Sequence, residues 1–172
     1  GPSLKWSINC PSTPPLSSHP SIPLSHQSLF QTFLENLKTR FNDKPGLDSD
    51  AIYPTVGLNI AKITHSQVEL TIWDLGGQVN LRSMWESYYS DAHAVIYLVD
   101  SSDQGRFKDV AKVVGDVTRA AKLDGVPILV LANKQDIGAA ARPDELQQLL
   151  GLEAVNNGHH TRVMGVSALK LQ

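Results

Sequence analysis

The chain has 172 residues, of which 41% are hydrophobic and 19% are charged, with 15 basic residues against 17 acidic ones and a net charge of −2. This is the size of one domain with one core, and the charge balance provides no basic field to hold nucleic acid. One cysteine cannot form an internal disulfide, and no apolar run approaches the roughly 18 residues that cross a bilayer, so both a disulfide-stapled scaffold and a membrane-spanning chain are excluded.

The first 28 residues differ in composition from the rest of the chain. They contain six of the ten prolines and eight serines, and Lys5 is their only charged residue. Prolines interrupt helical hydrogen bonding, and the segment has no periodic apolar face to bury. We therefore predict a disordered or loosely extended leader over residues 1–28 and one globular domain over residues 29–172.

The globular part opens with a helix and a hairpin. Leucine and phenylalanine at helical spacing predict an amphipathic helix over residues 29–41. Two β-rich stretches follow, at residues 57–64 and 68–73, and the short link between them requires antiparallel pairing. Near-continuous apolar runs over residues 94–99 and 126–131 are typical of parallel strands covered by helices on both faces.

Three further elements complete the pattern. Residues 106–123 have helical character, residues 143–150 predict a helix with proline near its first turn, and residues 161–167 predict a last strand. This alternation of strands and helices predicts an α/β fold with a mixed sheet and helices on both of its faces.

A motif with the sequence WDLGGQ follows the second hairpin strand. Asp74 can hold a metal ion through its water shell, Gly77 lets backbone N–H groups approach an anion, and Gln78 can orient an attacking water. The alternative is an ordinary strand that ends in a glycine-rich turn.

The sequence NKQD directly follows the predicted strand at residues 126–131. The Asp136 carboxylate can accept hydrogen bonds from the ring N–H and the exocyclic amino group of guanine, which distinguishes guanine from adenine. Asn133 can tie neighbouring loops together, and the stem of Lys134 can lie over a flat base. A polar loop after a strand is the alternative.

Two weaker signals accompany these motifs. Ser167 and Ala168 follow the last predicted strand, where a backbone amide can meet a carbonyl oxygen of a base. Thr55, in a loop ahead of the hairpin, can bind Mg²⁺ while a terminal phosphate is present. WDLGGQ, NKQD and the Ser167 motif all lie at the carboxyl ends of predicted strands, where an open α/β sheet binds its ligand.

The segments PTVGLNI, WDLGGQ, ESYYSDAHAVIYLVDSSD, VPILVLANKQD and SAL resemble, in order and spacing, the ADP-ribosylation factor (Arf) family of small GTPases over roughly residues 29–169. The resemblance implies a Ras-like fold, GTP or GDP with Mg²⁺ as bound ligands, and GTP hydrolysis. It implies an exchange factor, a GTPase-activating protein and effectors that bind the switch and hairpin surface. It also implies a cytoplasmic protein that associates with Golgi membranes and acts in vesicle trafficking.

The family's residue roles carry over by position. The resemblance implies that Gln78 positions the hydrolytic water and that Gly77 meets the terminal phosphate. The remaining implied contacts are Mg²⁺ on Thr55 and, through water, on Asp74, with guanine held by Asn133, Lys134, Asp136, Ser167 and Ala168.

One family motif is missing from the sequence. Family members carry a phosphate loop of the form GxxxxGK[ST], but this chain has no glycine between Gly1 and Gly46 and no Gly-Lys dipeptide. Aligned by the helix, the phosphate-binding lysine falls on Phe30 and the Mg²⁺-binding hydroxyl on Gln31. Losing two charge-assisted contacts weakens affinity by about 10² to 10⁴. We therefore expect GTP binding and hydrolysis to be impaired.

The first strand and the closing helix of the family are also expected to be missing. In the position of that strand, residues 21–28 contain Pro23, which a central strand does not tolerate, so we predict a split or poorly filled sheet. The family's closing helix would follow SAL, and the sequence ends before it. Two alternatives to a working GTPase stay open: a nucleotide-free interaction module, and a non-functional splice or gene-model variant.

Aromatic and histidine residues outside these motifs have plainer interpretations. Trp85, Tyr88 and Tyr89 follow Gln78 at helical spacing, which predicts either core packing or a partner contact. His159 and His160 lie in an Asn/Gly loop without cysteine or carboxylate partners, which favours a solvated loop over a metal site.

Overall fold

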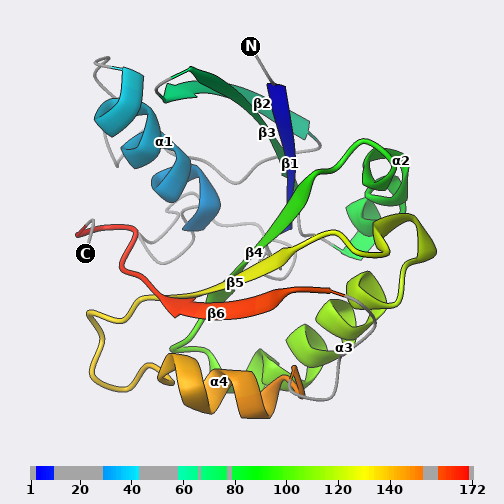
Figure 1. The fold of residues 1–172 in the computed structure, drawn as a ribbon. Coiled ribbons are helices and arrows are strands. Elements are labelled where there is room, and N and C mark those ends of the chain that lie inside the picture. Colours follow the sequence, from blue (N-terminus) through cyan, green and yellow to red (C-terminus); the bar gives the residue numbers. More distant parts are fainter. Residues whose placement is uncertain are drawn as a thin grey trace.

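A mixed six-stranded sheet with helices packed on both faces forms the centre of the protein (Figure 1). The computed structural model describes residues 3–9, 29–42, 58–65, 67–76, 79–152 and 159–170. Its elements in chain order are β1 (Ser3–Asn9), α1 (Leu29–Asn42), β2 (Leu58–His65), β3 (Val68–Leu75), the 3-10 helix η3 (Val79–Met84), α2 (Glu86–Tyr89), β4 (Ala94–Asp100), η4 (Gln104–Arg106), α3 (Phe107–Thr118), η5 (Ala121–Leu123), β5 (Ile128–Asn133), α4 (Pro143–Leu149) and β6 (Thr161–Gly165).

The strand order in the sheet is β2-β3-β1-β4-β5-β6. Strands β2 and β3 pair antiparallel, from Leu58 opposite Leu75 to His65 opposite Val68, which confirms the predicted hairpin. All the other pairs are parallel. The apolar runs that predicted parallel strands form β4 and β5, and both are buried on their two faces because helices cover each side.

The first strand is present, and the prediction that the sheet lacks it is wrong. Strand β1 lies between β3 and β4, with Asn9 opposite both Leu75 and Tyr97. It is formed by Ser3–Asn9, ahead of the proline-rich stretch, so Pro23 is not in the strand. The prediction of a disordered leader therefore fails for these residues, whereas residues 10–28 lie outside the described part of the chain.

The two faces of the sheet have separate apolar cores. On one face, α1 packs Leu34 against Ile63, Ile72 and Leu98, and Leu34 is completely buried. On the other face, α2, α3 and α4 cover the alternate side chains of β4 and β5. This alternation follows from the period of two in a strand, which sends successive side chains to opposite faces.

Helix α3 is shorter than the predicted helix over residues 106–123. It buries Val110, Val114 and Val117 at helical spacing, and it ends at Thr118. The chain then turns extended at Ala120, with φ −68° and ψ 116°, and this breaks the helical hydrogen bonding before η5.

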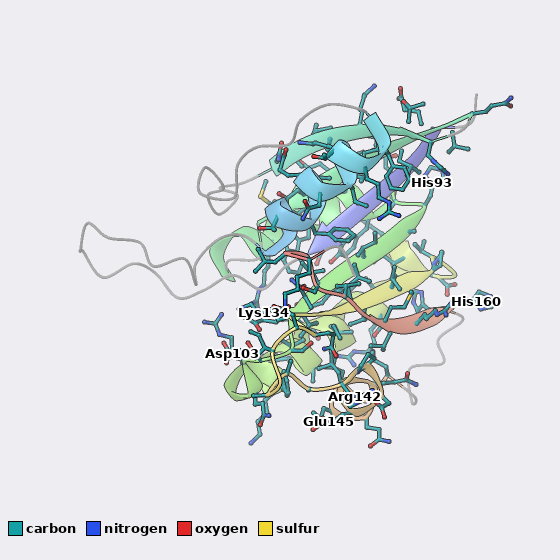
Figure 2. All side chains as sticks on the ribbon, turned by 90° about the vertical axis from the view of Figure 1, so that its left-hand side faces the viewer. His93, Asp103, Lys134, Arg142, Glu145 and His160 are labelled. Carbon is teal, nitrogen blue, oxygen red and sulfur yellow. The ribbon has the colours of Figure 1, made fainter. Side chains whose placement is uncertain are left out.

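The parallel strands all end at the same end of the sheet. Figure 2 shows Lys134 and Asp103, which follow β5 and β4, at one end of the sheet, and His93 and His160, which precede β4 and β6, at the other. The polar motifs of the sequence follow the strands, so they gather at the end of the sheet that carries Lys134 and Asp103.

Among the helices in the described ranges, none is both long and apolar enough to cross a membrane.

Candidate functional site

The point where the sheet reverses its direction of growth lies at the carboxyl end of β1. The chain adds β3 on one side of β1 and β4, β5 and β6 in succession on the other. Open α/β sheets bind their ligands at such a point, beyond the carboxyl ends of the strands. Predicted site residues lie on both sides of this point, Asp74 near the end of β3 and Asn133 at the end of β5.

Asn133 joins the loops that follow β5 and β6. Its side chain is buried, and its Oδ1 accepts a hydrogen bond of 2.9 Å from the backbone N–H of Ala168. Two backbone bonds support this link, from Val166 N–H to the carbonyl of Ala132 at 2.9 Å and from Gln135 N–H to the carbonyl of Val166 at 3.1 Å. The backbone at Ala168 is thus held beside the turn that carries Asp136.

Asp136 and Ser167 form the second link between these loops. The Ser167 hydroxyl donates to Oδ1 of Asp136 at 2.7 Å, while the Asp136 side chain is exposed and Ser167 is buried. This hydrogen bond stabilises the charged form and holds the pKa of Asp136 below its ordinary value of 3.8. Asp136 is therefore an ionised, solvent-facing acceptor at neutral pH, which is the form that binds two N–H donors of a base.

Lys134 has a left-handed backbone conformation with φ +68°. That conformation costs a residue with a Cβ about 1–2 kcal/mol, so neighbouring contacts must hold it. Its Nζ lies 2.7 Å from Oδ2 of Asp100, with both side chains about a quarter exposed. Burial raises the pKa of Asp100, but hydrogen bonds from Lys134 and Ser102 outweigh that effect and leave the pKa below 3.8.

Asp74 lies on the other side of β1. It is buried near the end of β3, opposite Asn59 on β2 and Ile8 on β1. Three strand spacings separate β3 from β5, which is about 14 Å. The connection that follows Asn9 of β1 therefore starts between Asp74 on one side and the NKQD turn on the other.

Three predicted site residues lie outside the described part of the chain, namely Thr55, Gly77 and Gln78. Gly76, which precedes Gly77 in the WDLGGQ motif, is described. Its carbonyl accepts a hydrogen bond of 3.1 Å from Trp85 Nε1. No group of three or more His, Cys, Asp or Glu side chains that could hold a metal ion occurs within the described ranges.

His159 is not a solvated loop residue, so that prediction is wrong. Its side chain is buried, with Nδ1 2.8 Å from the carbonyl of Val126 and Nε2 2.9 Å from the carbonyl of Thr118. The ring bridges the end of α3 and the segment before β5, and the Thr118 carbonyl is one of those that a helix end leaves without an intrahelical partner. His160 is exposed, as predicted.

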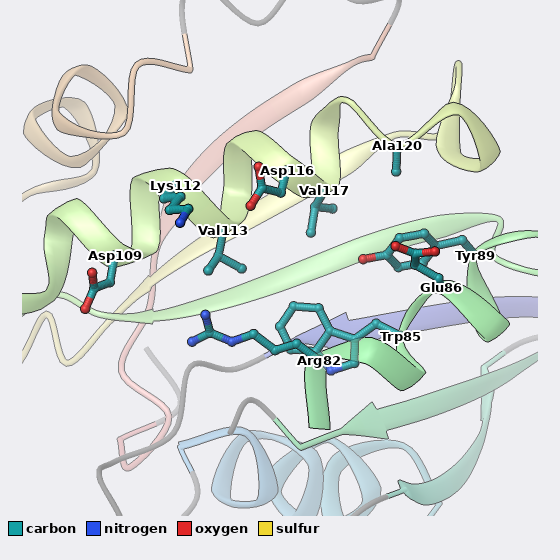
Figure 3. Close-up of a pocket in the computed structure, with 10 residues that line it drawn as sticks. All are labelled: Arg82, Trp85, Glu86, Tyr89, Asp109, Lys112, Val113, Asp116, Val117 and Ala120. Carbon is teal, nitrogen blue, oxygen red and sulfur yellow. The ribbon is translucent and has the colours of Figure 1, made fainter. Parts of the chain in front are cut away.

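A cavity of about 400 Å³ lies away from the predicted site, between α3 and the segment of η3 and α2 (Figure 3). Trp85, Tyr89, Val113 and Val117 are its buried wall residues, and Arg82 lies 5.9 Å from the Trp85 ring. It contains none of the residues predicted to bind nucleotide or metal. The sequence predicted either core packing or a partner contact for three aromatic residues in this region. Trp85 and Tyr89 are buried, and Tyr88 is half-buried.

Comparisons with known proteins identify the fold first. The chain matches the structure of the Arl6 BBS3 small GTPase from Trypanosoma brucei, which carries the nucleotide analogue GppNp, with a TM-score of 0.75 and 27% sequence identity over 98% of this chain and 89% of that one. The fold is therefore the mixed α/β fold of Ras-like small GTPases, as the sequence predicted.

The family follows from sequence similarity. The chain matches the ADP-ribosylation factor family over residues 32–172. It is 49% identical over 107 residues to ADP-ribosylation factor-related protein 1 of Rattus norvegicus, covering 62% of this chain and 53% of that protein. It is 40% identical over 124 residues to ADP-ribosylation factor-like protein 2 of Dictyostelium discoideum, covering 72% and 67%. The chain belongs to the ADP-ribosylation factor family, and it spans about half the length of the curated relatives first matched.

Family members bind GTP or GDP with Mg²⁺, and this chain fits such a ligand at one end of the site. At the base end, an ionised Asp136 supplies the required acceptor, and the Asn133 side chain holds the Ala168 backbone beside it by accepting the Ala168 N–H. At the phosphate end, residues 10–28 would have to supply the anion contacts, but they contain neither glycine nor lysine. The glycines and the lysine of a phosphate loop are therefore absent from the segment that joins β1 to α1.

Proposed function

We propose that this chain is an Arf-type guanine-nucleotide-binding domain that recognises guanine but binds and hydrolyses GTP poorly. The observation that carries the proposal is the geometry around Asp136, whose carboxylate is ionised, exposed and oriented by Ser167 at 2.7 Å. A carboxylate in this state accepts the two N–H donors on one edge of guanine, whereas adenine lacks that donor pair.

The base site is assembled from two loops. Asn133 holds the Ala168 backbone beside the NKQD turn, and Lys134 follows it in a fixed left-handed conformation. In this proposal Asp136 binds the donor edge of the base, and the Lys134 stem covers one face of the ring. The Ala168 N–H, which donates to Asn133 Oδ1 in the structure, is shared with the carbonyl oxygen of the base.

The phosphate end is the reason for the impaired activity that we propose. A phosphate loop supplies backbone N–H groups, a lysine and a hydroxyl to the phosphates and Mg²⁺. Phe30 and Gln31 stand where the lysine and the hydroxyl would be, and neither side chain supplies the same contact. When bound, Mg²⁺ neutralises charge that develops on the phosphates. Thr55 and Asp74 are the residues proposed to hold it, and Gln78 the residue proposed to position water.

Partners and location are proposed from the family. We infer that an exchange factor, a GTPase-activating protein and effectors bind the switch and hairpin surface, and that the protein acts in the cytoplasm and at Golgi membranes in vesicle trafficking. The hairpin supports a binding role, because Ile60 on the edge strand β2 is 54% exposed. Trp73 and Tyr88 lie beside each other, with ring centroids 5.6 Å apart, and connect the hairpin to α2.

A nucleotide-free interaction module is the second candidate function. One observation favours it: the polar groups of the base site already bind one another, Asp136 to Ser167, Lys134 to Asp100 and the Asn133 side chain to the backbone N–H of Ala168. The loops are thereby tied together by the protein's own groups. In this alternative the chain presents its hairpin surface to partners without responding to GTP.

A titration with nucleosides and nucleotides distinguishes these functions. We expect guanosine, GMP, GDP and GTP with Mg²⁺ to bind with affinities within about tenfold of one another, because no phosphate loop rewards the added phosphates. Each guanine ligand should raise the melting temperature once its concentration exceeds its dissociation constant, with a shift that grows with the logarithm of concentration, and adenosine should not. Submicromolar GTP binding would contradict the impairment, and binding of no guanine compound would favour the interaction module.

A further inference from the structure

We propose that Asp100 is a positioning residue of the guanine site, which holds Lys134 in the conformation that receives the base. The proposal rests on the proposed function, since it concerns the same base site. The sequence motifs assign no role to Asp100, which ends a buried strand 34 positions before Lys134.

The strand register brings the two residues together. Asp100 is the last residue of β4 and pairs with Asn133, the last residue of β5. Lys134 is therefore the first residue beyond the paired strands, and its ammonium reaches back across the strand end to Oδ2 of Asp100 at 2.7 Å. Because both strands are buried in the sheet, the backbone on each side of this ion pair is fixed.

The Asp100 carboxylate is itself held in place at its other oxygen. Oδ1 accepts hydrogen bonds from the backbone N–H of Ser102 at 3.0 Å and from the Ser102 hydroxyl at 2.6 Å. With one oxygen bound by Ser102 and the other by Lys134, the carboxylate cannot rotate without losing contacts. The charge-assisted hydrogen bond that Lys134 donates to this fixed acceptor then restricts the lysine to one arrangement.

Further hydrogen bonds link the same two turns. The backbone N–H of Ser101 donates to the carbonyl of Asn133 at 3.2 Å, and the N–H of Ala141 donates to the carbonyl of Ser101 at 2.7 Å. The Gln135 side chain closes the set by donating to the carbonyl of Ala141 at 2.9 Å. The turn after β4 is thus part of the framework of the NKQD turn.

Fixing Lys134 has a consequence for binding. A free lysine side chain loses rotamer freedom when it is ordered over a base, and this loss weakens binding. With its ammonium already bound by Asp100, Lys134 has less freedom to lose. We expect removal of this restraint to weaken guanosine binding by about 2- to 10-fold, which is the range for one immobilised side chain.

The test compares D100N with D103N. Asparagine keeps the shape of Asp100 but removes its charge. Asp103 is a matched control, because it lies at the same end of the sheet (Figure 2) and forms an ion pair of 2.8 Å with Arg106 rather than with Lys134. Thermal melting of both variants establishes that they fold. If D100N is too unstable to measure, D100E, which keeps the charge, is measured instead and should keep part of the restraint on Lys134.

The first measurement needs no ligand. The rate at which an amine-acetylating reagent modifies Lys134 in the intact protein is measured by mass spectrometry, with the exposed Lys108 as internal reference. We expect a several-fold faster reaction at Lys134 in D100N and no change in D103N. An unchanged rate in D100N would overturn the positioning role, whatever the nucleotide experiments show.

The second measurement uses guanosine, which has no phosphates and so reports on the base site alone. We expect weaker guanosine binding in D100N but not in D103N, and no further weakening by D100N in a K134A background, because the effect acts through Lys134. Unchanged affinity in D100N, or equal loss in the K134A background, would overturn the link to binding. Faster Lys134 acetylation without guanosine binding by the wild-type protein would keep the positioning role and reject the proposed function.

Discussion

The two ends of the candidate site differ in how their parts are supplied. The base end is built from turns after neighbouring parallel strands, and Asn133, Asp136 and Asp100 tie these turns to one another and to Lys134. The phosphate end depends on the connection between β1 and α1, and residues 10–28 contain neither glycine nor lysine. The two ends are therefore structurally independent, because the bonds that hold the proposed base end involve no residue of the connection between β1 and α1.

The largest expected effect comes from breaking the strand that lies between the two ends. Because β1 is paired on both sides, I8P removes a ladder hydrogen bond in the middle of the sheet and should lower the free energy of unfolding by about 3 kcal/mol or more. Urea unfolding monitored by circular dichroism measures the change. The control is S17P, in a stretch already rich in proline, where we expect a shift within about 0.5 kcal/mol. Equal effects of the two prolines would contradict a central β1.

The next largest effect concerns the base end alone. D136A removes the acceptor for both guanine N–H donors, and we expect it to reduce guanosine affinity by about 10² and to abolish the preference over adenosine. Competition between the two nucleosides, followed by ligand-observed nuclear magnetic resonance, measures the preference. D144A, an exposed carboxylate on α4, should leave it unchanged. Retained guanine preference in D136A would place the base elsewhere.

A smaller effect sharpens how the base end is held. S167A removes the hydrogen bond that lowers the pKa of Asp136, so that pKa should rise towards 3.8. Guanosine affinity should fall by about 2- to 10-fold, since one hydrogen bond contributes about 0.5–1.5 kcal/mol. Carbon-detected titration of the Asp136 carboxyl measures the pKa directly. A pKa that stays unchanged in S167A would show that another group stabilises the charged form.

The smallest effect is a pH dependence confined to acid. The folded pKa values of Asp100 and Asp136 both lie below 3.8, so both groups contribute stability that is complete above that value and is lost as the pH falls through the folded pKa. We expect guanosine binding to be flat from pH 7 to about pH 4 and to weaken below it. Guanosine affinity of the wild-type protein, measured at a series of pH values, checks this. A midpoint above pH 5 would assign the dependence to other groups.

Much of the fold could be predicted from the sequence, because most elements have local signals. The link of three residues decided the antiparallel pairing of β2 and β3, and the apolar runs located β4 and β5 to within two residues at each end. Strand β1 was missed although Leu4, Trp6 and Ile8 alternate along it. That short alternation was outweighed by the proline and serine composition of the residues that follow.

The candidate site divides in the same way. The NKQD motif located Asn133, Lys134 and Asp136 because their chemistry is recognisable in a run of four residues. Asp100 carries no such signal, since its role depends on the strand register that sets it beside Asn133. Residue type alone cannot reveal that pairing, because an aspartate at a strand end is also the usual start of a turn.

By itself, the sequence determined the hairpin, the parallel strands, the family and the position of the NKQD motif, since these depend on local periodicity or on contiguous residues. Only the tertiary structure decided that Ser3–Asn9 fills the centre of the sheet, that Asp100 holds Lys134, and that His159 is buried between two carbonyl groups. Each of these depends on contacts between residues distant along the chain, and such contacts follow from packing and strand order rather than from any local pattern.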